Sequence, residues 1–100
     1  MIHTLKTWPK YFQAVVDNEK TFEIRSESDR TFEVNDVLHL QEYDPENKRY
    51  SGREASAKVS YLIRGPDWGL PLGLVVLGLV GVRSRSRVTC QHSGYCGEVI

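Results

Sequence analysis

A lysine, a glutamate and an arginine lie within six positions of one another at Lys20, Glu23 and Arg25. A lysine beside a carboxylate can act as an acid–base pair, and a cation can also polarise a carbonyl group. The same two side chains can equally form a salt bridge without any chemistry, and the spacing alone favours this simpler interpretation. The three residues therefore matter for function only if the fold places them at the rim of a pocket.

Four further side chains have the chemistry to contact an anionic or aromatic ligand. A cation such as Lys6 or Arg30 can bind phosphate, although a lysine at a strand end or an arginine in a loop is commonly only a surface residue. An aromatic side chain can stack on a base, or it can simply pack or cap one end of the fold. The aromatic candidates are Tyr43, at the end of an expected strand, and Trp68, in a loop rich in Gly and Pro.

The sequence contains no recognisable metal or cofactor motif. Cys90, His92 and Cys96 near the C-terminus do not have the spacing of a known zinc site, which also needs a fourth ligand. There is no phosphate-binding loop, dinucleotide fingerprint or nucleophile elbow. We therefore expect neither a metal nor a cofactor.

The balance of charge separates the chain into a body and a tail. Residues 1–80 contain ten Lys or Arg and twelve Asp or Glu, whereas residues 81–100 contain three Arg and one Glu. A body with a slight negative charge does not hold nucleic acid non-specifically, and nothing in it is specific to DNA. The longest apolar run, residues 70–82, is shorter than the ~20 residues of a spanning helix. We expect a cytoplasmic monomer away from membranes.

The elements that must position these residues are one helix and several short strands. Pro9 suits the first turn of a helix over residues 7–20, which has one apolar face and ends near Asn18. Short strands separated by turns predict an α+β fold, a closed or partly closed barrel of five to six strands with this helix near the N-terminus. Strands are expected at residues 1–6, 21–26, 31–34, 37–43, 53–64 and 74–80.

The expected strand over residues 21–26 carries the charged residues on one face. Its alternation places Phe22 and Ile24 on one side and Thr21, Glu23 and Arg25 on the other. If the two apolar side chains fill the core, the charged ones face outward or into a groove under the helix.

These residues also carry a resemblance to a known family. The stretch N-E-K-T-F-E-I-R (18–25) is similar to the G-x-K-x-x-E-x-R signature of the ASCH family, whose fold is like the PUA domain of RNA-modifying enzymes. F-E-V-N-D-V-L-H-L-Q-E-Y-D-P (32–45) resembles its second recurrent segment. I-H-T-L-K-T-W-P (2–9) and Y-S-G-R-E (50–54) resemble one uncharacterised branch in bacterial and phage genomes. The resemblance covers residues 1–80 and leaves residues 81–100 as a basic tail that we expect to be loosely ordered.

The resemblance implies a PUA-like barrel with a groove that binds RNA or nucleotides. Some ASCH relatives are amidohydrolases that act on acetylated cytidine with the signature lysine as a catalytic residue, and others are reported as ribonucleases. Here Asn18 replaces the signature glycine, and Glu23 stands where the amidohydrolases carry Thr. The helical insertion that holds their second carboxylate is also missing, so their mechanism does not transfer intact.

Three functional hypotheses follow. The first is a module that recognises a short single-stranded RNA element or a modified base. The second is a small hydrolase, an amidohydrolase on an acetylated pyrimidine nucleoside or a ribonuclease, with Lys20 and Glu23 as the catalytic pair. The third is a protein-interaction factor of phage origin. The expected ligand-binding residues are Lys6, Lys20, Thr21, Glu23, Arg25, Arg30, Tyr43 and Trp68.

Overall fold

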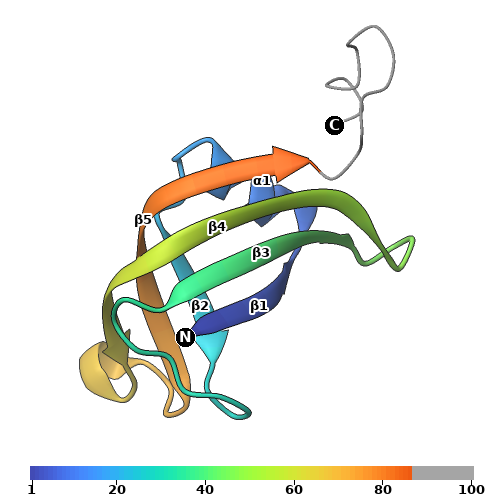
Figure 1. Ribbon diagram of the computed structural model, residues 1–100. Helices are drawn as coiled ribbons and strands as arrows, with labels where there is room; N and C mark the ends of the chain where they lie inside the picture. The colour runs from blue at the N-terminus through green and yellow to red at the C-terminus, as the bar shows by residue number, and fades with distance from the viewer. Residues whose placement is uncertain (87–100) are drawn as a thin grey trace, which may run out of the picture.

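A computed structural model of the protein describes residues 1–86 and shows one helix packed into a single curled sheet (Figure 1). Cys90, His92 and Cys96, which were not expected to form a metal site, lie outside this described part, as does most of the expected tail. The elements are β1 (Ile2–Thr7), α1 (Pro9–Val16), β2 (Phe22–Ser26), β3 (Val37–Asp44), β4 (Arg49–Arg64), a short 3-10 helix (Asp67–Gly69) and β5 (Leu74–Ser86).

The sheet is a half-barrel and does not close. Its strands run in the order β1-β3-β4-β5-β2, so that β1 and β2 are the two edges. β1 is parallel to β3, and the other neighbours are antiparallel. A closed barrel needs backbone hydrogen bonds between its first and last strands, and no such ladder joins β1 to β2 within residues 1–86. The α+β class and the single N-terminal helix are confirmed, whereas the closed form of the barrel is wrong.

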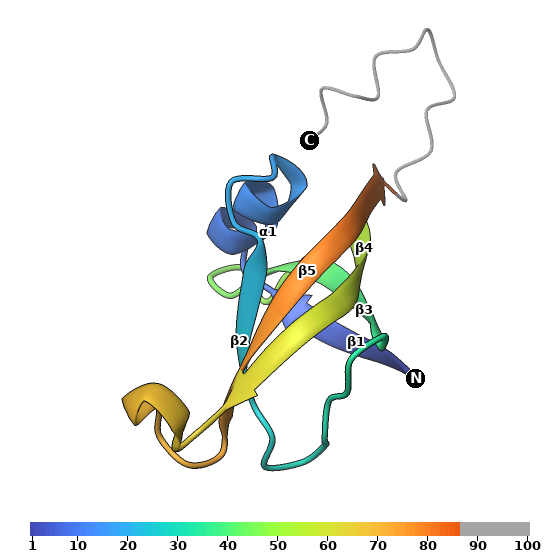
Figure 2. The same ribbon diagram turned by 90° about the vertical axis from the view of Figure 1, so that its left-hand side faces the viewer.

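The curl comes from the two longest strands. β4 and β5 cross the whole sheet, and their pairing shifts register between Ser56 and Lys58 and again between Val59 and Tyr61. Irregularities of this kind bend a strand and increase its twist. Figure 2 shows the result: β4 and β5 curve away from β1, and α1 lies at one end of β2.

The core lies between the concave side of the sheet and α1. Phe12 and Val15 are the fully buried residues of the helix, three positions apart and therefore on one face. They join the inward-facing residues of the strands. The rest of this cluster is Leu5, Phe32, Leu38, Leu40, Ala55, Ala57, Val59, Val75, Leu77 and Leu79.

The predicted strand at residues 31–34 is wrong, although its aromatic residue is in the core. Phe32 is buried, but this segment has no strand neighbour. Its backbone groups are satisfied by side chains instead, because Phe32 N–H donates to Glu27 Oε2 (2.9 Å) and Phe32 O accepts from the Arg64 guanidinium. Side-chain partners of this kind remove the need for a sheet neighbour.

The largest differences from the predicted element boundaries are in α1, β4 and β5. α1 is shorter than predicted, because the backbone of Trp8 is extended and the helix begins only at Pro9. Asn18 takes the left-handed conformation (φ 60°) expected at the helix end. β4 begins at Arg49, ahead of the predicted start. β5 continues to Ser86, so the expected boundary at residue 80 falls inside a strand. No helix within residues 1–86 has the length and apolar character needed to cross a membrane.

Candidate functional site

β2 alternates as predicted, but its faces are the reverse of the expected ones. Glu23 is only 3% exposed, whereas Phe22 and Ile24 are 41% and 52% exposed. The two apolar side chains therefore do not fill the core, and Glu23 is the buried residue of this strand. A buried carboxylate is tolerated where cations and hydrogen bonds satisfy it, and Glu23 has a cation on each side along the chain.

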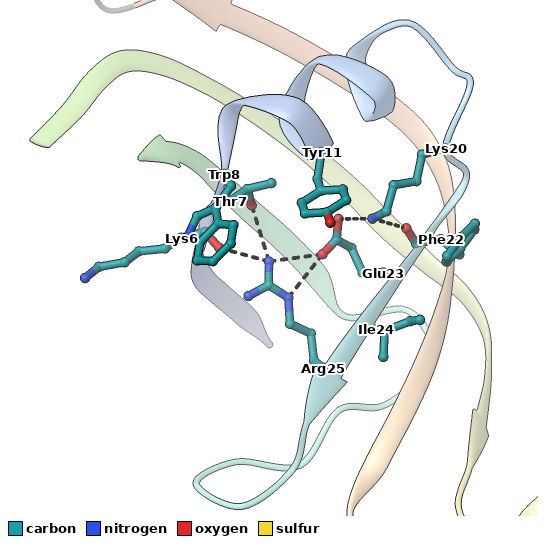
Figure 3. A pocket seen from close by; sticks show the side chains of 9 residues that line it. All are labelled: Lys6, Thr7, Trp8, Tyr11, Lys20, Phe22, Glu23, Ile24 and Arg25. Carbon is teal, nitrogen blue, oxygen red and sulfur yellow. Dashed lines mark hydrogen bonds and ion pairs between the residues drawn. The ribbon is translucent and has the colours of Figure 1, made fainter. Parts of the chain in front are cut away.

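Both oxygens of Glu23 are held by cations. Lys20 Nζ donates to Glu23 Oε2 at 2.7 Å. Arg25 binds the other oxygen, with Nε at 3.1 Å and Nη2 at 3.0 Å from Glu23 Oε1. The three residues singled out from the sequence therefore form one network, which is drawn in Figure 3.

Arg25 also connects the two open edges of the sheet. Its Nη2 donates to the backbone oxygen of Lys6 (3.0 Å) and lies 3.3 Å from Thr7 Oγ1. Both acceptors belong to β1, while Arg25 belongs to β2. The guanidinium thus crosses the seam where a closed barrel would have a backbone ladder, and it fixes the end of β1 from which α1 departs.

A groove of about 710 Å³ opens over this network. Aromatic and aliphatic side chains form most of its wall, and the cations of Lys20 and Arg25 outweigh the single carboxylate of Glu23. Trp8 and Tyr11 approach from the start of α1, while Phe22 and Ile24 approach from β2 (Figure 3). The complete lining is Lys6, Thr7, Trp8, Tyr11, Lys20, Phe22, Glu23, Ile24 and Arg25.

The two cations at the base of the groove keep unused donors. An ammonium has three N–H groups, and the interactions of Lys20 within residues 1–86 use two of them, with Glu23 and with the backbone oxygen of Phe22 (2.7 Å). The Arg25 bonds use Nε and Nη2, which leaves Nη1 without a partner in the same part of the chain. Lys20 Nζ also lies 5.1 Å from the Phe22 ring centroid and 5.7 Å from that of Tyr11. The Lys20 ammonium therefore lies near two aromatic rings, those of Phe22 and Tyr11.

The structure places the other predicted ligand residues around or away from this groove. Lys6 supplies its backbone oxygen, but its amine points out of the groove in Figure 3 and lies 4.3 Å from the ring centroid of Tyr43. Thr21 and Tyr43 are not in the lining. Arg30 borders a second hollow and lies 3.8 Å from Asp29.

Trp68 is far more exposed than a groove residue. Its side chain is 90% exposed in the short 3-10 helix between β4 and β5, and it is absent from the groove lining. Within residues 1–86 no three His, Cys, Asp or Glu side chains converge as metal ligands do.

Sequence reasoning missed the aromatic wall of the groove. Trp8 and Tyr11 fall within the predicted amphipathic helix over residues 7–20, yet they are 53% and 44% exposed. Trp8 precedes the first helical residue in an extended conformation, so helical periodicity does not govern its direction. The available signal was an excess of large aromatic residues at a helix start, more than one short helix can bury.

The chain matches a known protein family over most of its length. The family model described as "Domain of unknown function (DUF3850)" matches residues 2–79. No curated protein matches the chain.

Proposed function

Because the chain belongs to the DUF3850 family, whose description assigns no activity, we propose its function from the groove: it binds the base of a nucleotide or of a short single-stranded RNA. The observation that carries this proposal is the combination of exposed aromatic rings with free cationic donors in one groove. Soluble proteins rarely leave such apolar surface uncovered without a binding role.

The aromatic wall supports stacking. A base has two flat apolar faces, and stacking on an aromatic side chain contributes about 1–3 kcal/mol per base. Trp8, Tyr11 and Phe22 offer rings from two different elements, so a planar group can enter between α1 and β2. Single-stranded RNA is recognised in this way because its bases are free to leave the stack.

The cations support recognition of polar edges. Lys20 and Arg25 present unused N–H donors at the base of the groove, where they can bind a carbonyl oxygen of a pyrimidine or a phosphate oxygen. These are also residues through which the sequence resembles the ASCH signature, and that resemblance favours RNA or a modified nucleoside over an unrelated planar ligand.

A hydrolase is the second candidate, favoured by the 2.7 Å contact between Lys20 Nζ and Glu23 Oε2. In that case the pair would move a proton while Arg25 holds the substrate. The same contact also fits a purely structural role, in which Glu23 holds Lys20 and Arg25 in place through its two oxygens. Formation of product from a bound nucleoside or RNA distinguishes the two functions.

The test uses the fluorescence of Trp8. The chain has two tryptophans, and Trp68→Phe removes the exposed one outside the groove, leaving Trp8 as the only indole. Cytidine monophosphate and a short single-stranded RNA are then titrated into this variant. We expect saturable quenching of Trp8, and Lys20→Ala should weaken binding by about tenfold, the loss of one charge-assisted hydrogen bond.

Lys58→Ala is the matched control, because Lys58 is an exposed lysine on β4 outside the groove lining. It should bind within about twofold of the parent, a difference too small to represent a lost contact. Thermal melts of both variants serve to check that they are folded. Equal weakening by the two substitutions would reduce the binding to non-specific charge attraction and would contradict the proposed groove.

A further inference from the structure

A third hollow, of about 270 Å³, lies across β3, β4 and β5, apart from the groove and from the hollow beside Arg30. His39 of β3, Ser56 of β4 and Arg83 of β5 are successive cross-strand partners, and the next row includes Glu54 and Arg85. Partners across antiparallel strands share a face of the sheet. Because His39 alternates with the buried Leu38 and Leu40, this is the face turned away from the core.

Two arginines, Arg83 and Arg85, line this hollow side by side on β5. Arg83 and Arg85 are two positions apart on one strand, so they share a face at a separation of roughly 7 Å along the strand. Both are exposed, and within residues 1–86 neither forms a hydrogen bond or an ion pair. Like charges at this spacing repel each other, and an anion between them would relieve that repulsion.

The acidic residue of the hollow is in contact with a histidine. Glu54 is buried, and its Oε1 is in contact with His39 Nε2. The lining therefore combines a His–Glu pair with two exposed guanidinium groups and the hydroxyl-bearing Ser56. The two arginines outweigh the single carboxylate of the lining.

We propose that this hollow is a phosphate-binding site, with Arg83 and Arg85 as the charged ligands and Ser56 as a hydroxyl donor. Guanidinium groups present paired N–H donors that match the oxygens of phosphate, and a hydroxyl beside them adds a further donor. The ligand is a phosphate group, either free or esterified, or the phosphodiester of a nucleic acid strand. The site is built without any residue of the groove, so it does not depend on the proposed base-binding function.

The test follows backbone amide shifts of the full chain during titration with inorganic phosphate at constant ionic strength. We expect saturable shifts in the β4 and β5 residues around Ser56 and Arg83. The double variant Arg83→Gln/Arg85→Gln should weaken binding by about tenfold or more, because it removes the charge-assisted bonds. If the double variant does not fold, Ser56→Asp is tested in its place. This variant keeps both arginines but adds a carboxylate, and it should abolish phosphate binding. Lys20→Ala should leave phosphate binding within twofold, whatever it does to the groove.

A dinucleotide without a terminal phosphate, UpU, distinguishes the source of the phosphate. Shifts of the same amides by UpU support a phosphodiester ligand, and shifts by inorganic phosphate alone support a free or terminal phosphate. Shifts that rise linearly without saturation, or that persist in the double variant, would overturn the site.

Discussion

Replacing Glu23 by Gln tests whether the buried carboxylate holds the groove together. Gln has nearly the same shape but carries no charge, and only one of its two terminal atoms is an acceptor, because the other is an N–H donor. Lys20 Nζ and the Arg25 guanidinium lie on different oxygens of Glu23. In Glu23→Gln one of the two cations therefore faces an amide N–H group and loses its acceptor.

The magnitude follows from the burial of the three groups. A hydrogen bond to a charged group contributes about 1.5–3 kcal/mol, and removing one partner of a fully buried ion pair costs about 3–5 kcal/mol. Glu23 is almost fully buried, but the side chains of Lys20 and Arg25 are 17% and 23% exposed, so water can partly replace the lost partner. We expect the free energy of unfolding to fall by about 2–3 kcal/mol.

Urea unfolding followed by circular dichroism measures this change. With the usual dependence on urea for a small domain, the midpoint should move down by about 1–2 M. Glu19→Gln is the control, because Glu19 is an exposed glutamate near the same helix end and its side chain has no partner within residues 1–86. The control should stay within about 0.5 kcal/mol of the parent. If Glu23→Gln also stayed within that range, the ion pairs would not hold the groove and our account of β2 would fail.

Two further predictions concern the sheet edge and acid stability. Arg25→Lys should lose the bonds to Lys6 O and Thr7 Oγ1, lower stability by about 1–2 kcal/mol and speed amide exchange in β1; unchanged exchange there would refute a bridging role. Burial opposes ionisation of Asp36, but hydrogen bonds led by that with His3 lower its pKa from 3.8 to about 2. Its contribution of about 2 kcal/mol is therefore complete above about pH 4 and lost as the pH falls toward 2. In urea unfolding, the free energy of unfolding of Asp36→Asn should fall less than that of the parent between about pH 4 and about pH 2. Parallel curves of stability against pH for the two proteins would contradict this.

The arrangement of elements was largely predictable, because it depends on local patterns. Pro9 at the helix start, Asn18 at its end and the alternation along the strands all act within a few residues, and the structure contains each of them. The predicted strand at residues 31–34 failed for a non-local reason. Glu27 and Arg64 satisfy the backbone of Phe32 from distant parts of the chain, and no local pattern encodes that contact.

The sequence indicated the charged residues of the candidate site, but not its aromatic wall or the orientation of β2. Alternation shows that Glu23 and Phe22 lie on opposite faces, but it does not show which face is buried. The usual rule of an apolar interior fails here because Lys20 and Arg25 neutralise Glu23. The same reversal exposes Phe22 beside the helix and creates the aromatic wall.

The most direct test of the central claim is an amide shift titration of the labelled protein with cytidine, acetylated cytidine and a short single-stranded RNA, each also assayed for product. We predict saturable shifts at Lys20, Glu23 and Arg25 and at the indole N–H of Trp8, with little change at Trp68. Product from one ligand would identify the groove as a catalytic site. If titration with each of the three ligands to high concentration produced no shifts in these residues, the result would contradict a base-binding groove. A protein partner would then be the better explanation of its exposed aromatic wall.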